Sequence, residues 1–335
     1  MSDRSSREIR LAARPHGFPA PSDFTLARVD VPDPASGQVL VRNLFMSVDP
    51  YMRGRMNAGK SYVPAWEVGQ PLDGSALGEV VASKADAVKV GDIVSSGLGW
   101  RELFVADAAA VRVVDPAVQP VTSYLGVLGA AGLTAWVGLN LVDVKAGDRV
   151  FVSGAAGAVG HVAGQLARRR GCFVVGSAGS SEKVKMLVDE LGFDAAFNYR
   201  DGDITGQLTA AAKDGIDVYF DNVGGDHLEA ALASMRLHGR VSACGGISRY
   251  NDETPSPGPC NLFQIVAKRI TIRGFIVIDS FHQMPEFLAE VAPMIASGRL
   301  KAKETIVEGG VDRAPGTFVD MLRGTNVGKM VLKLV

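Results

Sequence analysis

The stretch DRVFVSGAAGAVGHVAGQLARRR, residues 148–170, joins a short apolar run, three glycines and an amphipathic segment. The run DRVFV has the β-branched and aromatic residues that are typical of a buried parallel strand. Strand, glycine turn and helix in this order predict the phosphate-binding βα unit of a dinucleotide-binding domain. After the glycines, the apolar residues that share one helical stripe are Val159, Val162, Ala163, Leu166 and Ala167.

The glycines follow a G-x-x-G-x-x-G spacing, at Gly154, Gly157 and Gly160. Small residues permit the tight turn, Gly157 lets the backbone approach a pyrophosphate, and Gly160 lets the helix pack closely on the strand. Free amides and the dipole at the helix start favour the negative charge of a phosphate. A tight turn without a ligand is the alternative, but the strand–helix repeats that follow argue against it.

Two compositions divide the chain. Residues 1–125 contain short β-rich runs between Gly, Pro and Asp turns, which predict a small barrel-like β domain. From Gly126 onward, uninterrupted apolar runs alternate with helical segments, as in a doubly wound parallel sheet. The strand-like tail GKMVLKLV indicates that the chain end rejoins the first domain. We therefore expect one domain at 1–125 with 300–335, and a second at 126–299.

Bulk composition excludes several classes of protein. The 35 basic and 36 acidic residues leave a formal net charge of −1, so nothing suggests a nucleic-acid or membrane-surface partner. The N-terminus lacks the apolar core of a signal peptide, and no run approaches the roughly 18 apolar residues of a membrane span. Three cysteines do not form a disulfide framework. We expect a cytoplasmic protein.

The second predicted strand, CFVVGSAGSSEK, bears on the choice of cofactor. An NAD site expects an acid about 20 residues after the glycines, where it binds the ribose hydroxyls. Here no acid precedes Glu182, and Lys183 follows in the next helix. This pattern favours the 2′-phosphate of NADP, although a solvated surface lysine is the alternative. Tyr199 and Arg200, which end the next strand, are expected to close over the adenosine end.

Missing motifs narrow the chemistry further. No cysteine precedes Cys172, and no C-x-x-C pair occurs, so neither a catalytic nor a structural zinc site is expected. Hydrolase and P-loop motifs are also absent. His161, His227 and His238 have no spaced partner and are interpreted as surface or capping histidines.

Hydride transfer without a metal suits reduction of a C=C bond conjugated to a carbonyl, because the resulting enolate needs only a hydrogen-bond donor. Tyrosine is a natural donor. Tyr250 follows the strand RVSACGG, at the end of the sheet where ligands bind. Tyr51 and Tyr62 lie in first-domain segments that we interpret as loops. For each tyrosine, half-buried packing is the alternative interpretation.

Several motifs, in order, resemble the zinc-free medium-chain dehydrogenases/reductases of the prostaglandin reductase and leukotriene dehydrogenase type. These motifs are LFMSVDPYMRGRM, GVLGAAGLTAWVGL, GAAGAVG, DVYFDNVGG, CGGISRYN and GTNVGK. The start of the chain and DPYMRGRM are most similar to the bacterial NADPH-dependent curcumin reductases. The resemblance covers roughly residues 10–335. It implies a GroES-like β-barrel catalytic domain with an inserted Rossmann domain, NADP(H) as cofactor, 2-alkenal or enone substrates and a homodimer.

The resemblance also implies roles for individual residues. Tyr250 and Tyr62 would be the catalytic pair, and Tyr51, Tyr62 and Tyr250 would contact the substrate. The implied cofactor contacts are Gly157, Ala158, Val159, Gly160, Lys183, Tyr199, Asn222, Cys244, Gly245, Ile247, Tyr250, Phe275, Val277 and Asn326. No metal is implied. One departure concerns the stretch IVIDSFH, where Phe281 is the only aromatic residue, so the lipid substrates of prostaglandin reductases do not carry over.

The sequence as a whole favours an NADPH-dependent 2-alkenal/2-alkenone reductase. An NADPH quinone oxidoreductase or a zinc-less alcohol dehydrogenase on the same scaffold stays open. So does a non-catalytic NADPH-binding protein that has kept the fold.

Overall fold

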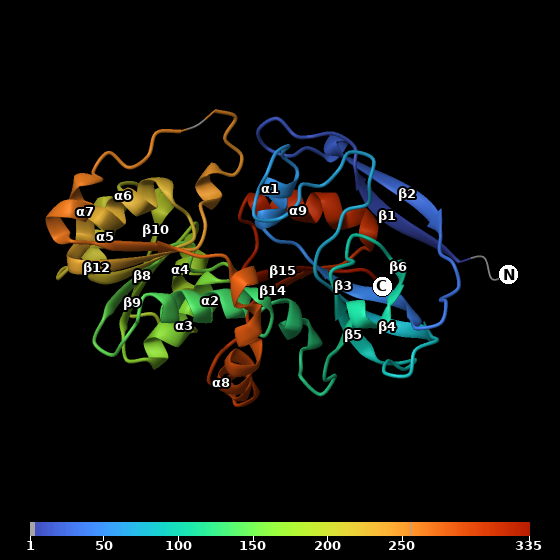
Figure 1. Ribbon diagram of the computed structural model, residues 1–335. Helices are drawn as coiled ribbons and strands as arrows, with labels where there is room; N and C mark the ends of the chain where they lie inside the picture. Colours follow the sequence, from blue (N-terminus) through green and yellow to red (C-terminus); the bar gives the residue numbers. More distant parts are fainter. Residues whose placement is uncertain (1–3, 255) are drawn as a thin grey trace. The chain divides into compact units, whose positions relative to one another are not determined.

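The computed structural model describes residues 4–254 and 256–335, which form two compact units (Figure 1). One unit contains the chain up to Leu125 together with Glu304–Val335, and the other is Gly126–Lys303. The proline-rich stretch RYNDETPSPGPC, residues 249–260, predicts a loop, and Pro255 within it lies outside the described residues. Within the described residues, every helix is too short or too polar to traverse a lipid bilayer.

The first unit is built on a sheet with strand order β14-β15-β3-β4-β5-β7, in which β6 also pairs with β3. A separate hairpin is formed by β1 (Ser5–Leu11) and β2 (Phe24–Asp30). The C-terminal strand β15 pairs antiparallel with β3, so the tail does join the N-terminal segment. The sheet strands are β3 (Gln38–Ser47), β4 (Ala76–Ser83), β5 (Ile93–Ser96), β6 (Leu103–Asp107), β7 (Arg112–Val113), β14 (Glu304–Val307) and β15 (Lys329–Lys333).

Aromatic packing fills the core of the first unit. Trp100 is fully buried, stacks on Phe24 and meets Trp66 and Phe318 edge-on. Offset and edge-to-face ring pairs of this kind add to the stabilisation that burial alone provides. The helical elements of this unit are η1 (Pro21–Asp23), α1 (Tyr51–Arg55), η2 (Ala108–Ala110), η3 (Val121–Leu125), η7 (Val311–Arg313) and α9 (Ala314–Leu322).

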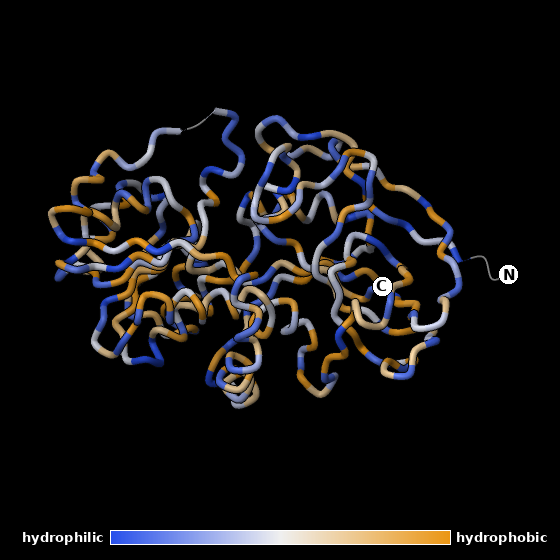
Figure 2. Tube along the Cα trace, in the orientation of Figure 1, coloured by the Kyte–Doolittle hydropathy of each residue, from blue (hydrophilic) through white to orange (hydrophobic). Residues whose placement is uncertain are grey.

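The second unit contains a six-stranded parallel sheet in the order β10-β9-β8-β11-β12-β13. The order reverses between β8 and β11, which is the topological switch point where such sheets bind ligands. Figure 2 shows orange, hydrophobic stretches in this sheet. The strands are β8 (Arg149–Val152), β9 (Phe173–Ala178), β10 (Ala195–Asn198), β11 (Ile216–Asp221), β12 (Met235–Ala243) and β13 (Thr271–Gly274).

Helices cover both faces of this sheet (Figure 1). On one face α2 packs on α3, and on the other α5 packs on α6 and α6 on α7. The helical elements are α2 (Ala130–Leu141), α3 (Gly160–Arg169), α4 (Ser181–Asp189), η4 (Tyr199–Asp201), α5 (Ile204–Ala211), α6 (Gly225–Ser234), η5 (Ile247–Arg249), α7 (Phe263–Lys268), η6 (Val277–Gln283) and α8 (Met284–Ala296).

Two predicted boundaries in this unit are wrong. The pattern DHLEAALASMRL predicts a helix over 226–237, but α6 ends at Ser234 and β12 begins at Met235 without a loop. The run ITIRGFIVI predicts a strand over 270–278, but β13 ends at Gly274 and η6 starts at Val277. In both cases sheet pairing, which the local pattern cannot reveal, decides where the element begins or ends.

Candidate functional site

The glycine loop follows β8 and leads directly into α3, as the sequence predicts. Gly154 has φ = +57°, the left-handed region that favours glycine and that makes the tight turn. A Cβ at Gly160 would lie 2.4 Å from the carbonyl oxygen of Gly154, so only glycine lets the helix start this close to the loop. The Ala155 amide donates to the Ser177 carbonyl at 2.8 Å, which fixes the loop against β9.

This loop has the donors that a phosphate requires. Within the described chain, the amides of Ala158 and Val159 donate to no acceptor, and α3 begins at the next residue. Helix-start amides and the helix dipole together attract an anion. A Cβ on Gly157 would lie 3.2 Å from the Gly154 carbonyl oxygen, so the methyl of an alanine would crowd the loop. The residues present therefore fit the pyrophosphate of a dinucleotide.

His161 supports the loop from beneath, so its interpretation as a surface residue is wrong. The imidazole is 1% exposed, and the amide of Lys303 donates to its Nε2 at 3.2 Å. Because Nε2 accepts, Nδ1 carries the proton and donates to the Gly157 carbonyl at 2.8 Å. Burial lowers the pKa of His161 to about 4, so the ring is neutral at physiological pH.

The predicted adenosine end lies where β9 and β10 finish. Ser180 caps α4 and accepts from the Lys183 amide at 3.3 Å, which places Lys183 in the first turn. Lys183 is half-buried. Its pKa is lowered mainly by burial and, to a smaller extent, by the positive charge of Arg200. A Cβ on Gly179 would lie 2.8 Å from the Tyr199 hydroxyl, so this hydroxyl reaches the β9–α4 loop. Lys183 and Arg200 thus lie at the same end of the sheet and interact electrostatically, and the Tyr199 hydroxyl lies at the start of the Lys183 helix.

A buried hydrogen-bond network joins the ends of β8 and β11. The Tyr219 hydroxyl lies 2.9 Å from Ser153 Oγ and 2.7 Å from the Asp221 carboxylate. Asp221 also accepts from the amides of Val223 and Gly224, and burial raises its pKa. Asn222 donates from its side chain to the Ser153 carbonyl at 2.8 Å. Asn222 therefore holds the loop after β11 against the glycine loop.

The loop that follows β12 is bonded to the same region. The amides of Cys244 and Gly245 donate to the Asp221 carbonyl at 2.9 and 3.0 Å, and that of Ile247 donates to Asn222. Burial raises the pKa of the Cys244 thiol to about 12, so this thiol stays protonated. Cys244, Gly245 and Ile247 accordingly lie at the carboxyl edge of the sheet, beside Asn222.

Tyr250 folds back over this edge. Its hydroxyl accepts from the Gly246 amide at 3.4 Å, and a Cβ on Gly245 would lie 3.2 Å from the same oxygen. Burial is the main cause that raises the pKa of Tyr250, and the neighbouring Cys244 and Asp221 add to it. The phenol is therefore protonated and able to donate a hydrogen bond near neutral pH.

The other predicted contacts of the second unit lie at its edges. The Phe275 ring packs against α2, because a Cβ on Gly138 would lie 2.8 Å from its Cζ. Val277 begins η6 and is half-buried.

The remaining predicted residues belong to the first unit. Asn326 donates to the Gly328 carbonyl at 2.7 Å. Tyr51 is the first residue of α1, so its assignment to a loop is wrong, and burial raises its pKa. Tyr62 is 54% exposed.

His227 and His238 have opposite surroundings. His238 is exposed, as the sequence predicts. His227 is 4% exposed, so its surface interpretation is wrong; it stacks on Phe151 and meets the Tyr199 ring edge-on. Its Nε2 is buried and finds no hydrogen-bond partner in the described chain. Burial lowers the pKa of His227 to about 4.

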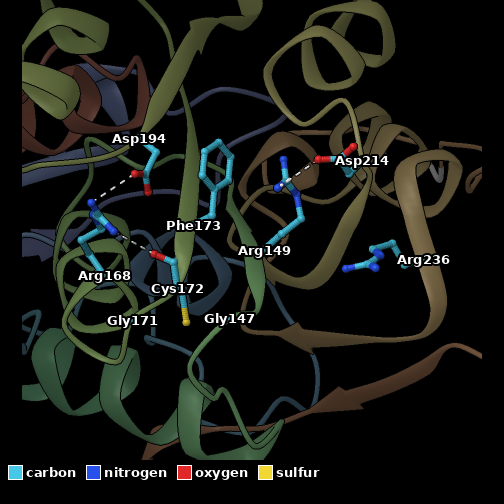
Figure 3. A pocket seen from close by; sticks show the side chains of 9 residues that line it. All are labelled: Gly147, Arg149, Arg168, Gly171, Cys172, Phe173, Asp194, Asp214 and Arg236. Atoms are coloured by element: carbon cyan, nitrogen blue, oxygen red, sulfur yellow. Dashed lines mark hydrogen bonds and ion pairs between the residues drawn. The ribbon is translucent and has the colours of Figure 1, made fainter.

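A separate cavity of about 460 Å³ opens at the amino ends of the same strands (Figure 3). Its arginines are each neutralised: Arg149 pairs with Asp214, Arg168 with Asp194, and Arg236 with Asp217. None of the predicted site residues lines this cavity. We therefore place the candidate site at the carboxyl edge.

Known proteins are similar to this chain over nearly its whole length. Residues 7–114 match the N-terminal domain of oxidoreductases, and residues 158–293 match the zinc-binding dehydrogenase family. The NADP⁺-dependent 2-alkenal reductase of Nicotiana tabacum is 40% identical, over 98% of this chain and 97% of its own. The NADPH-dependent curcumin reductase of Escherichia coli is 38% identical, over 100% and 99%.

The crystal structure of CurA from Vibrio vulnificus in complex with NADPH superposes with a TM-score of 0.93, at 36% identity over 98% of this chain and 99% of CurA. The chain belongs to the medium-chain dehydrogenase/reductase family of the curcumin and prostaglandin reductases. The predicted resemblance and the predicted fold class, a GroES-like domain with a Rossmann domain, are both confirmed.

The zinc in the name of the matched family does not fit the residues present. Among the described residues, no group of three or more His, Cys, Asp or Glu side chains is placed to hold a metal ion. The first cysteine of the chain is Cys172, which is buried and donates to the Lys145 carbonyl.

Sequence reasoning missed the residues that hold the loops rather than face a ligand. These are Ser153, Tyr219 and Asp221, with His161 and His227 beside them. One signal was available: Asp221 is a charged residue directly after the apolar run VYF, and a buried carboxylate must be hydrogen-bonded. The histidines carried no such signal, because their partners come from distant segments.

Proposed function

We propose that the chain catalyses the NADPH-dependent reduction of the C=C bond of α,β-unsaturated aldehydes and ketones, without zinc. Its membership of the curcumin and prostaglandin reductase family supports this reaction class, as do similar proteins named as alkenal and curcumin reductases. NADP(H) is the cofactor, and small carbonyl compounds are the partners.

The cofactor is held mainly by the carboxyl edge of the parallel sheet. The amides of the segment Gly157, Ala158, Val159 and Gly160 receive the pyrophosphate, and Lys183 and Tyr199 bind the 2′-phosphate. The further proposed contacts are Asn222, Cys244, Gly245, Ile247, Tyr250, Phe275, Val277 and Asn326. When bound, NADPH supplies the hydride that reaches the β-carbon of the substrate.

Tyr250 stabilises the charge that this transfer creates. Reduction at the β-carbon leaves an enolate, whose oxygen accepts a hydrogen bond from the phenol, and a proton from solvent then completes the saturated product. The observation that carries this proposal is the position of the Tyr250 hydroxyl beside Gly245 and Gly246, with a raised pKa that keeps it protonated. One such donor contributes about 2.7–4 kcal/mol to transition-state stabilisation.

Two tyrosines of the first unit are proposed to act on the substrate. Tyr62 is exposed, so its phenol is accessible. Burial and the nearby carboxylate of Asp49 raise the pKa of Tyr51, which keeps it a neutral hydrogen-bond donor. We assign Tyr62 as the second catalytic donor and Tyr51 as a substrate contact.

We also propose a homodimer, formed through the edge strand β13. All four residues of β13 are exposed, and an open strand edge is a template for pairing with a second copy. Large apolar side chains are exposed nearby in sequence, including Phe263 at 75% and Val266 at 67% on α7, and Ile272 on the strand itself. Such exposure is characteristic of a protein–protein interface.

A substrate panel tests the proposed reaction. NADPH oxidation is followed at 340 nm with 2-alkenals, 2-alkenones, small quinones and saturated carbonyls. We expect fast turnover with the first two, and a saturated aldehyde or ketone as product. Turnover confined to quinones would instead identify a quinone oxidoreductase, and tight NADPH binding with no turnover at all would identify a binding protein.

A further inference from the structure

Arg200 is held in place at the end of β10. Its amide donates to the Asn198 side-chain oxygen at 3.2 Å, and Asn198 Nδ2 donates to the Asp201 carboxylate at 2.6 Å. The first of these bonds caps η4 and fixes the backbone at Arg200 without a ligand. The second directs the neighbouring Asp201 carboxylate to Asn198.

The guanidinium of Arg200 lies over the Tyr199 ring, 5.8 Å from its centroid. The side chain is exposed, and no carboxylate of the described residues lies at ion-pair distance from it. A cation–π contact consumes no hydrogen-bond donor, so the N–H groups of the guanidinium stay available to an anion.

The charge of Arg200 acts on Lys183. After burial, it is the second cause that lowers the pKa of Lys183. Two cations held near each other at fixed backbone positions repel, and a dianion placed between them would relieve that repulsion. The Tyr199 hydroxyl, which reaches the Gly179 position in the same loop, adds a neutral donor.

His227 fixes the ring that carries this arrangement. Its imidazole contacts the Tyr199 ring edge-on, with 5.2 Å between centroids, and stacks on Phe151 of β8. The ring of Tyr199 therefore contacts the Arg200 guanidinium as well as a buried histidine. The packing of the Tyr199 ring on His227 exists without a ligand, so this ring needs no further ordering when a ligand binds.

We propose that Arg200 is a specificity-determining residue that clamps the 2′-phosphate of the cofactor together with Lys183, and so selects NADPH over NADH. The inference rests on the proposed cofactor but not on the proposed substrate. A guanidinium presents two parallel N–H groups to a phosphate, which an ammonium cannot do. The clamp accordingly needs arginine, and not merely a positive charge, at this position.

Calorimetric binding of two nucleotide fragments tests the clamp without turnover. The probes are 2′,5′-ADP, which carries the 2′-phosphate, and 5′-AMP, which lacks it. For Arg200→Gln we expect at least a tenfold weaker affinity for 2′,5′-ADP, because a charge-assisted contact is worth about 10- to 150-fold. Affinity for 5′-AMP should stay within about twofold. Arg200→Lys should fall between the parent and Arg200→Gln.

Lys213→Gln is the matched control. It removes one positive charge from an exposed position of the same unit, and should change neither affinity. Unaltered binding of 2′,5′-ADP by Arg200→Gln would overturn the proposal, and so would an equal loss for both fragments. Arg200→Lys binding as tightly as the parent would refute the requirement for a guanidinium. If Arg200→Gln weakens 2′,5′-ADP binding as expected but the parent reduces no enone, only the proposed function is wrong. If the parent reduces enones but Arg200→Gln binds 2′,5′-ADP normally, only the role of Arg200 is wrong.

Discussion

The two ends of the parallel sheet in the second unit carry arginines in very different surroundings. At the amino end, Arg149, Arg168 and Arg236 each pair with an aspartate around an open cavity. At the carboxyl end, Arg200 has no such partner among the described residues and acts on Lys183. The amino end has a cavity whose arginines are paired, whereas the carboxyl end has an exposed arginine that acts on Lys183 and a glycine backbone open to close approach.

The difference teaches that volume alone does not identify a binding site. Neutralised arginines have already exchanged water for carboxylates, so an incoming anion would have to displace those partners. Amides without acceptors and cations held together gain stability when an anion arrives. Each prediction below changes one feature of the carboxyl end, or asks whether a feature elsewhere matters.

The largest effect is expected from Tyr250→Phe. Removal of the phenol hydroxyl should lower kcat for enone reduction by roughly 100- to 1,000-fold, the usual cost of losing one oxyanion donor. The affinity for NADPH, measured by fluorescence titration, should hardly change. Tyr124→Phe, which alters a tyrosine in η3 of the first unit, is the control and should retain full kcat. Full activity in Tyr250→Phe would remove the proposed donor.

Lys183→Ala should shift cofactor preference. Loss of one charge-assisted contact to the 2′-phosphate lowers the ratio of kcat/KM for NADPH to that for NADH by about 10- to 150-fold. Steady-state kinetics with both cofactors measure the ratio. Lys185→Ala, two residues along the same helix and paired with Asp189, is the matched control. A ratio equal to that of the parent would return Lys183 to the role of a surface lysine.

His227→Phe should make the protein less sensitive to acid. The folded-state pKa of about 4 lies below the ordinary value of 6.5, so the unfolded chain binds the proton first. Stability is therefore lost as pH falls from 6.5 toward 4, by about 2 kcal/mol for this group at pH 5. Urea unfolding at pH 7 and pH 5 measures the test: the free energy of unfolding should fall by about 2 kcal/mol less in the variant than in the parent.

His161 has a similar pKa of about 4. It should therefore lower the free energy of unfolding at pH 5 by a comparable amount, and this decrease should persist in His227→Phe. The exposed His282 provides the control. His282→Phe should show the same difference in unfolding free energy between pH 7 and pH 5 as the parent. An unchanged pH dependence in His227→Phe would mean that the buried ring is already protonated or is not buried.

Gly157→Ala should weaken NADPH binding by about tenfold, since a methyl group at the closest backbone approach costs a phosphate contact worth about 1.4 kcal/mol. Gly160→Ala should act on folding instead, because its Cβ would meet the Gly154 carbonyl oxygen at 2.4 Å. Gly316→Ala, where a Cβ would meet nothing within 4 Å, is the control for both variants. Differential scanning fluorimetry with and without NADPH separates the two effects.

Chelation should have no effect at all. Incubation with EDTA and 1,10-phenanthroline should leave enone reduction unchanged, because the described residues contain no cluster of metal ligands. Loss of activity that zinc restores would contradict the proposed mechanism.

Local sequence patterns predicted the parts of the site that one segment builds. The glycine loop could be predicted from the spacing of its glycines, because the steric constraints on Gly154 and Gly160 both arise within this seven-residue segment. The positions of Lys183 and Tyr250 followed from the rule that loops after parallel strands share one edge. The family then supplied the cofactor and the substrate class.

The supporting residues could not be predicted, because their partners are remote in the chain. Ser153 meets Tyr219 across 66 positions, and His161 meets Lys303 across 142. Burial, which makes both histidines neutral, also arises only when distant elements pack. The start of β12 at Met235 has the same origin, since pairing with β11 overrides the helical pattern.

Hydrogen exchange with and without NADPH compares the two ends of the sheet directly. The account predicts that NADPH protects amides in 153–160, 178–183 and 199–201, and leaves those in 145–149 and 168–173 unchanged. Protection around the arginine-lined cavity, with no change in the glycine loop, would contradict it.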